Sequence, residues 1–300
     1  MTRVVAIGEC MVEFSATARQ GHYQLGFAGD TLNTAWYLRR LLGPSDQVDY
    51  VTGVGTDNIS DQMLAFLESA GIGTTHIQRM ADRTVGLYMI QLDEGERSFA
   101  YWRGESAARA MMQDSDRLRE ALTGAQIAYL SGITIAILPQ ADREILARIL
   151  GDFRQSGGQV VFDPNLRPRL WQSPAQMTAA VMAIAGVADT VLPSYEDEAA
   201  WFGDSDPAET ARRYLGVGAQ SVVVKNGPGD ILAVANGEEI VIPIRPSTNV
   251  VDTTAAGDSF NAGFLAALLD GQQTRDAVLA GADLSARVIG QYGALVDIGQ

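Results

Sequence analysis

The chain has 300 residues, 47% of them hydrophobic and 19% charged, which is typical of a globular protein and excludes a low-complexity chain. Asp and Glu outnumber Lys and Arg by 36 to 22, so the net charge of −14 speaks against nucleic acid or an anionic membrane as a partner. The single cysteine, Cys10, excludes an intrachain disulfide, and with only His22 and His76 beside it a Cys/His metal site is not expected. No apolar run reaches the roughly 18 residues of a membrane helix. We therefore expect a cytoplasmic protein whose chemistry rests on Asp, Glu, Lys or the backbone.

Short apolar runs, typical of buried strands, alternate with longer helical patterns along the chain. In chain order the predicted elements are a strand at 4–7, a helix at 30–42, a strand at 48–54, a helix at 60–70, a strand at 127–130, a helix at 139–155, a strand at 160–162, a helix at 174–186, a strand at 190–192, a helix at 207–216, a strand at 222–224 and helices at 257–270 and 275–291. Such alternation predicts an α/β fold of parallel strands with crossover helices, in one domain over residues 1–300.

Residues 84–91 and 97–103 break this pattern because both alternate in the manner of strands. With Glu94-Gly95 as the connecting loop, Tyr88 lies opposite Tyr101, and Gly86 opposite Arg103. Side chains alternate along a strand, so Tyr88, Tyr101 and Arg103 then share one face. We expect this hairpin to cover a cleft as a small lid, formed by about residues 10–28 and 76–105.

The segment Asp252-Thr253-Thr254-Ala255-Ala256-Gly257-Asp258-Ser259-Phe260 carries the strongest functional signal. Its small residues precede a helix whose first N–H groups and dipole would form an anion site, and they let the backbone approach a phosphate closely. Asp258, in the first turn, is placed to accept a proton from a hydroxyl, as one aspartate commonly does in phosphoryl transfer. The alternative is an ordinary capped helix with an acidic first turn.

This segment resembles the C-terminal signature of the ribokinase-like (PfkB) carbohydrate kinases, with Ala255 in place of the usual first glycine. Residues 28–35, Ala-Gly-Asp-Thr-Leu-Asn-Thr-Ala, resemble the family's other signature. The segments 8–11, 101–103 and 167–171 are similar to those of the 2-keto-3-deoxygluconate kinases within the family. The resemblance implies a mostly parallel central sheet flanked by helices with a small β-sheet lid, and phosphorylation of the 6-hydroxyl of 2-keto-3-deoxygluconate by ATP with Mg²⁺.

The resemblance also implies where the sugar acid would bind. It assigns contacts with the sugar to these residues: Gly29, Asp30, Asn33, Tyr88, Tyr101, Arg103, Arg167 and Asp258. The guanidinium of Arg103 offers a fork of donors that suits a carboxylate. Read in isolation, Asp30 is a residue that caps the helix after it, and the alternative for Arg103 is a solvated arginine on a hairpin.

For the nucleotide the resemblance implies Asn165, Lys225, Gly227 and Gly229, together with the backbone of Ala255, Ala256 and Gly257 as the oxyanion site. Lys225 would approach a phosphate, although Asn226-Gly227 is also a strong turn signal. Ser194 and Asp197 occupy the two key positions of the family's magnesium-organising Asn-x-x-Glu motif, where Asp197 would act on Mg²⁺ through water. The alternative for Asp197 is an acidic helix N-terminus.

Three questions remain open in the sequence. Asp252, with Thr254, is a candidate for a monovalent cation such as K⁺, as in some members of the family. The alternatives in function are a kinase of the same fold for another sugar, such as fructose or ribose, and a sugar-sensing protein without catalysis. The exposed edges of a small lid sheet favour a homodimer formed through the lid.

Overall fold

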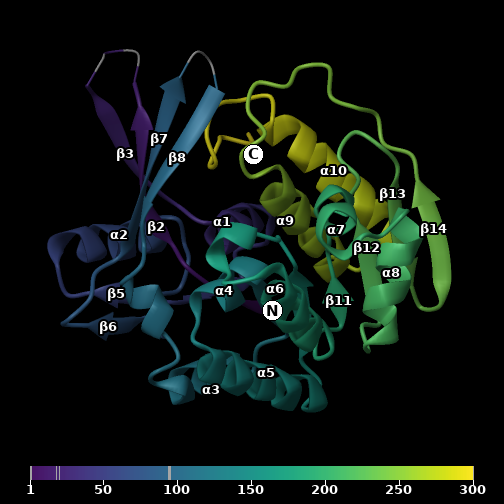
Figure 1. The fold of residues 1–300 in the computed structure, drawn as a ribbon, viewed down its shortest axis with the longest axis horizontal. Coiled ribbons are helices and arrows are strands. Elements are labelled where there is room, and N and C mark those ends of the chain that lie inside the picture. Colours follow the sequence, from purple (N-terminus) through teal and green to yellow (C-terminus); the bar gives the residue numbers. More distant parts are fainter. Residues whose placement is uncertain (1, 18, 20, 94–95, 300) are drawn as a thin grey trace.

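An eight-stranded sheet forms the centre of the computed structural model, which describes residues 2–17, 19, 21–93 and 96–299 (Figure 1). Its strand order is β14-β13-β12-β11-β10-β9-β1-β4. The parallel strands are β4 (Gln47–Val51), β1 (Arg3–Ile7), β9 (Ile127–Ser131), β10 (Gln159–Asp163), β11 (Thr190–Val191) and β12 (Ser221–Val224). Two antiparallel strands, β13 (Ile231–Ala235) and β14 (Glu238–Ile242), complete one edge. The predicted mostly parallel α/β sheet is confirmed.

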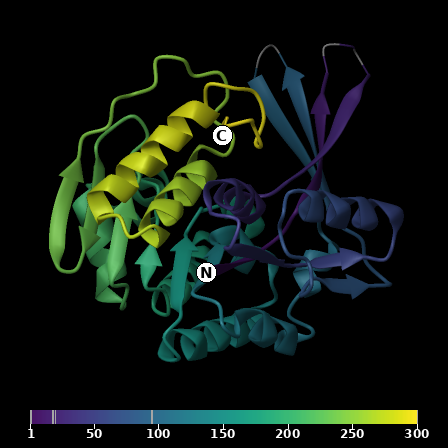
Figure 2. The same ribbon diagram turned by 180° about the vertical axis from the view of Figure 1, so that it is seen from behind.

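Helices cover both faces of this sheet, and its central strands are therefore buried on both sides. On β1, Val4 and Ala6 belong to one hydrophobic core and Val5 and Ile7 to the other, as the alternation of side chains along a strand requires. The first core includes α1 (Asp30–Leu41), α2 (Asn58–Ser69), α9 (Ala256–Leu269) and α10 (Thr274–Val288). The second includes α3 (Ser115–Leu122), α4 (Gly132–Ile137), α5 (Gln140–Gln155), α6 (Pro174–Ala185) and α8 (Pro207–Gly216). Figure 2 shows α1, α9 and α10 from behind.

A separate four-stranded sheet, which we call the lid, projects from the body (Figure 1). Its order is β3-β2-β7-β8, formed by β3 (Tyr23–Ala28), β2 (Met11–Ala16), β7 (Gly86–Asp93) and β8 (Glu96–Trp102). In the β7–β8 hairpin Tyr88 pairs with Tyr101, as predicted from the alternation of the two segments. The predicted loop residues Glu94 and Gly95 lie outside the described residues.

Some elements differ from the sequence prediction. The strand expected at 48–54 divides at Thr52 into β4 and β5 (Gly53–Gly55), and β5 pairs with β6 (Gln78–Met80) outside the lid. The short helices α3, α4 and α7 (Tyr195–Phe202) and the edge strands β13 and β14 were not predicted. Within the described part of the chain, no helix has both the length and the apolar composition needed to cross a membrane.

Candidate active site

The carboxyl ends of the parallel strands bring polar side chains to one edge of the central sheet. Glu9 follows β1, Asp163 ends β10 and Lys225 follows β12. All three are buried. Open α/β sheets bind ligands at this edge, since the loops that leave parallel strands meet there. The first turn of α9 lies at the same place: a Cβ built on Gly257 would stand 3.6 Å from Lys225 Nζ.

Asp258 lies in the first turn of α9 and is held by two neighbours on α1. Asn33 Nδ2 donates a hydrogen bond to Asp258 Oδ2 at 2.8 Å, and Thr34 Oγ1 donates to the Asp258 carbonyl oxygen at 3.1 Å. Burial, reinforced by the negative charge of Asp30, raises the pKa of Asp258 to about 8. A carboxyl group with a pKa near neutrality is suited to accept a proton in catalysis.

Asp30 occupies the first turn of α1, next to the loop at Gly29 that is predicted to contact the sugar and that we call the sugar loop. Its side chain connects this loop to the end of β10. The helix N-cap is Gly29 rather than Asp30, so the capping alternative does not describe this aspartate. Its Oδ1 accepts from the Thr31 backbone N–H at 2.8 Å, and its Oδ2 accepts from Asn165 Nδ2 at 2.6 Å. Burial raises the pKa of Asp30. Asn165 therefore contacts a residue predicted for the sugar, although the sequence placed it near the nucleotide.

Lys225 is the basic group at the centre of the site. Its Nζ donates to Asp163 Oδ2 at 3.1 Å and to Asn261 Oδ1 at 3.2 Å. Asn261 Nδ2 donates in turn to the same Asp163 oxygen at 2.6 Å. These bonds fix the ammonium beside the first turn of α9, where an anion would meet both the lysine and the helix N–H groups.

The turn after Lys225 joins β12 to β13 as an antiparallel hairpin. Gly227 has a φ of 52°, in the left-handed region that glycine adopts most readily, and the Gly229 N–H donates to the Asn226 carbonyl oxygen at 2.8 Å. The turn predicted from Asn-Gly is therefore present. A nucleotide contact at the two glycines stays a prediction.

Ala255 is the N-cap residue of α9 and has a left-handed backbone, with φ 59° and ψ 17°. An L-residue with a Cβ is strained in this region by roughly 1–2 kcal/mol, which explains why glycine is usual at this position of the resembling signature. The Ala256 N–H donates to the Thr253 carbonyl oxygen at 3.2 Å and closes the turn before the helix. One of the three N–H groups predicted for the oxyanion site is thus also part of the turn.

Asp252 ties this loop to the C-terminal segment. Its Oδ1 accepts from the Thr254 N–H at 3.0 Å and from Thr254 Oγ1 at 2.7 Å, while its Oδ2 accepts from the Gly293 N–H at 2.8 Å. The neighbouring Ala294 packs against lid residues in a small apolar cluster. Asp252 therefore orders the loop that precedes the oxyanion site. A monovalent cation there stays a prediction.

The lid brings its predicted sugar residues together, with different surroundings for each. The rings of Tyr88 and Tyr101 lie 5.8 Å apart, but the Tyr88 hydroxyl donates to Glu13 on the neighbouring strand. The Tyr101 side chain is half exposed. The alternative of a solvated Arg103 is wrong, because its guanidinium forms an ion pair with the buried Glu9.

Arg167 and Asp197 lie side by side after β10 and on α7. Their closest nitrogen and oxygen are 3.7 Å apart, and the Arg167 side chain is 51% exposed. Burial raises the pKa of Asp197, and the charge of Arg167 opposes that rise. The long separation leaves the Arg167 guanidinium able to reach an anionic ligand.

A buried ion network anchors helix α7, which carries Asp197. Arg213 on α8 donates to Glu198 at 2.7 Å and also pairs with Asp204. The Tyr214 hydroxyl donates to Glu198 at 3.0 Å, and burial raises the pKa of Glu198 to about 7. At the other end of this segment, the Tyr195 N–H donates to the Lys225 carbonyl oxygen at 2.8 Å. The network thus connects the position of Asp197 with that of Lys225.

The sequence prediction did not assign roles to Asp163, Asn261 and Glu9. Two of them had a recognisable signal. Asp163 directly follows the apolar run of a buried strand, and Asn261 lies three residues after Asp258, on the same side of the helix. Glu9 stood within a segment used only for the resemblance, and its contact with Arg103 spans 94 residues of sequence, which no local pattern reveals.

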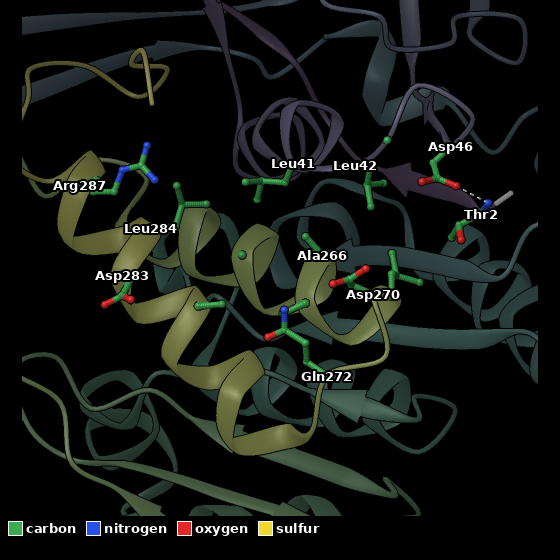
Figure 3. Close-up of a pocket in the computed structure, with 15 residues that line it drawn as sticks. Thr2, Leu41, Leu42, Asp46, Ala266, Asp270, Gln272, Asp283, Leu284 and Arg287 are labelled. Carbon is green, nitrogen blue, oxygen red and sulfur yellow. Dashed lines mark hydrogen bonds between the residues drawn. The ribbon is translucent and has the colours of Figure 1, made fainter. Parts of the chain in front are cut away.

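The described residues also form cavities outside this cluster. One of about 630 Å³ lies between the lid and residues 292–295, with Glu13, Ile90 and Thr254 in its wall. Another of about 410 Å³ lies between the end of α1 and the last turns of α9 (Figure 3). Asp46 and Asp270 are among its lining residues, and Asp46 accepts a hydrogen bond from the Thr2 N–H at 2.7 Å. It lies about three helical turns from Asp258 and contains none of the predicted site residues.

Comparisons with known proteins identify the family and the fold. Residues 1–298 match the family described as pfkB family carbohydrate kinase. A 2-dehydro-3-deoxygluconokinase of Dickeya dadantii is 40% identical over 98% of this chain and 97% of its own. A PfkB protein from Polaromonas sp. JS666 superposes with a TM-score of 0.86 at 31% identity, covering 97% of this chain and 96% of its own. A putative ribokinase II from E. coli, solved in complex with ATP and Mg²⁺, has a TM-score of 0.84 at 20% identity, covering 98% and 94%, and shows the shared fold.

Proposed function

The chain belongs to the pfkB family of carbohydrate kinases, and from this premise we propose that it transfers the γ-phosphate of ATP to the 6-hydroxyl of 2-keto-3-deoxygluconate, also called 2-dehydro-3-deoxygluconate. The product would be 2-keto-3-deoxy-6-phosphogluconate. The observation that carries the proposal is Asp258, a carboxyl group of raised pKa in the first turn of α9, with Lys225 beside the same turn. This arrangement supplies a base and an anion site within one helical turn.

In the proposed reaction the sugar hydroxyl oxygen attacks the γ-phosphorus. The bond from that phosphorus to the bridging oxygen of ADP breaks, and the hydroxyl proton passes to Asp258. The backbone N–H groups of Ala255, Ala256 and Gly257 and the Lys225 ammonium would stabilise the charge on the transferred phosphoryl oxygens. The lid would exclude water, which otherwise competes as acceptor.

The described residues fit a magnesium ion that is bound mainly through the nucleotide. They contain no group of three His, Cys, Asp or Glu that could hold a metal by itself. Asp163 already accepts from Lys225 and Asn261, so Asp197 is the carboxylate that would act on Mg²⁺, through water. Mg²⁺ commonly keeps several waters and one or two carboxylates beside phosphate oxygens, whose charge it neutralises when bound.

The chemistry of the arginines supports a sugar acid as the substrate. Arg103 and Arg167 both offer planar donors that match a carboxylate, and neutral sugars such as fructose and ribose carry no such group. The relative from Dickeya dadantii, 40% identical over nearly the whole chain, has the corresponding name. Asp30 and Asn33, which flank the buried Thr31 and Leu32 at the start of α1, would meet the sugar hydroxyls.

We further propose that the enzyme works in the cytoplasm as a homodimer paired through its lids. The outer face of the lid exposes apolar side chains, among them Tyr23, Leu25 and Trp102, the last 58% exposed. Pairing two such faces would cover this apolar surface. The buried free thiol of Cys10 suits a reducing compartment.

A substrate panel with ATP and Mg²⁺ tests the proposal. ADP release would be compared for 2-keto-3-deoxygluconate, its galactonate epimer, gluconate, fructose and ribose. We expect turnover with the keto-deoxy sugar acids, and an Arg103→Ala variant whose KM rises by about tenfold or more for them. Activity on neutral sugars alone would refute the substrate while leaving the family unchanged. Absence of ADP release with every sugar would favour the non-catalytic alternative.

A further inference from the structure

Glu9 is a buried acidic residue at the catalytic edge of the sheet that the proposed reaction does not use. It lies two residues after the end of β1 and is 2% exposed. Its burial raises the pKa of the carboxyl group, whereas the charge of Arg103 and hydrogen bonds from Arg103 and Ser106 oppose that rise. A buried carboxylate of this kind is costly unless it is paired, so its partners indicate what it is for.

The Glu9 side chain joins the body of the protein to the base of the lid. Its Oε2 accepts from an Arg103 terminal nitrogen, and its Oε1 accepts from the Ser106 hydroxyl. Arg103 follows β8 directly, and only 10% of its side chain is exposed. Its Nε–H is buried and has no hydrogen-bond partner among the described residues. Arg103 is therefore held from one side while a donor remains unused.

The backbone of Glu9 also packs against the sugar loop. A Cβ built on Gly29 would lie 2.2 Å from the Glu9 carbonyl oxygen, so only glycine fits there. A Cβ on Gly86, the first residue of β7, would lie 2.9 Å from Glu9 Oε1 and 3.2 Å from Arg103 Cβ. Glu9 thus lies where the sugar loop and lid strand β7 meet Arg103, and its position fixes their spacing.

We propose that Glu9 is a positioning residue that fixes the Arg103 guanidinium relative to the sugar loop at Gly29 and thereby sets selectivity for a carboxylated sugar. The inference rests on the proposed sugar-acid kinase function. A free arginine loses considerable rotamer entropy when it binds a ligand, and a guanidinium already held by Glu9 has lost it before the ligand arrives. The geometry of the carboxylate contact then depends on Glu9, which itself touches no substrate.

The test is a double-mutant cycle of Glu9→Gln and Arg103→Ala, with KM for 2-keto-3-deoxygluconate and for ATP measured separately. Glu9→Gln preserves the shape of the side chain and removes its charge. We expect KM for the sugar acid to rise about tenfold and KM for ATP to change less than about twofold. The double variant is expected to match Arg103→Ala alone, because Glu9 acts through Arg103. Glu105→Gln, an exposed acid in the same loop, is the matched control.

Additive effects of the two substitutions, or an unchanged KM for the sugar acid, would overturn the role of Glu9. A purely structural role would lower Tm and change both KM values together. If Glu9→Gln does not fold, Glu9→Asp keeps the charge but withdraws the carboxylate from Arg103 by one carbon, and it is expected to give the same selective rise in KM for the sugar acid. A wild-type enzyme without activity on any sugar acid would instead refute the proposed function. An active wild type with an unaffected Glu9→Gln variant would refute only the role of Glu9.

Discussion

Asp258→Asn is expected to stabilise the fold while it abolishes turnover. Burial and Asp30 raise the pKa of Asp258 from 3.8 to about 8, so the folded protein holds a proton there that the unfolded chain releases. Between these two pKa values the stability of the wild type falls as the pH rises, and above pH 8 the full cost of the buried charge remains. An asparagine has no charge to bury and can still accept the hydrogen bond from Asn33.

The size of the effect follows from the pKa interval. At about 1.4 kcal/mol per pKa unit, the charge costs the folded state up to about 6 kcal/mol above pH 8. Asp258 is half-buried by its accessible surface, so solvent screens part of this cost. We therefore expect the variant to gain about 2–4 kcal/mol at pH 9, less at pH 7, and under about 1 kcal/mol at pH 5.

Urea unfolding of the wild type and the variant at pH 5, 7 and 9 measures this difference directly. Glu120→Gln on the exposed face of α3 is the control, and its stability should stay within about 0.5 kcal/mol of the wild type at each pH. Equal stabilities of wild type and Asp258→Asn at pH 9, or a gain that does not depend on pH, would refute the reasoning. Turnover measured alongside should fall by about 10²–10⁴ if Asp258 is the base.

Three further changes test other parts of the structure. Ala255→Gly relieves the left-handed strain and should raise the free energy of unfolding by up to about 1 kcal/mol. Ala262→Gly, in the middle of the same helix, should lower it by about 1 kcal/mol or more, and equal effects of the two changes in urea unfolding would contradict this. Arg213→Met leaves two buried carboxylates unpaired and should cost about 3 kcal/mol, against less than about 0.5 for the exposed Arg212→Met; a similar loss of Tm in both would show that the network contributes little. Trp102→Lys on the outer lid face should shift light scattering from dimer to monomer with Tm unchanged, and an unaltered mass would exclude pairing through that face.

The elements of the central sheet could be predicted because their signals are local. The apolar runs that became β1, β9, β10 and β12 are buried on both faces, and the helices between them carry clear periodicity. Short elements escaped prediction: α4 has six residues, too few for two helical turns of pattern. The edge strand β14 is antiparallel, partly exposed and begins with two glutamates, so it lacks the continuous apolar run of the central strands. Its neighbour β13 is a continuous apolar run, and the prediction of alternating helices and parallel strands passed over it.

For the site, the sequence identified which residues gather but not how they pair. Asp258 and Lys225 were predicted for one site from separate motifs, and the structure brings the lysine beside the first turn of α9, which carries Asp258. The sequence prediction assigned Arg103 to a substrate carboxylate, yet in the structure its guanidinium already forms an ion pair with the carboxylate of Glu9. Pairings of this kind join residues far apart in the chain, and they depend on tertiary packing that a single sequence does not display.

The crowding of Asp30, Asp163 and Asp258 around a single lysine has a consequence for the heat of ligand binding. A phosphate anion entering here would raise the pKa values of Asp30 and Asp258 further, so the protein should take up protons from the buffer as it binds nucleotide. The binding enthalpy measured by calorimetry would then change with the ionisation enthalpy of the buffer. In this way the cleft would couple nucleotide occupancy to the proton balance of its surroundings.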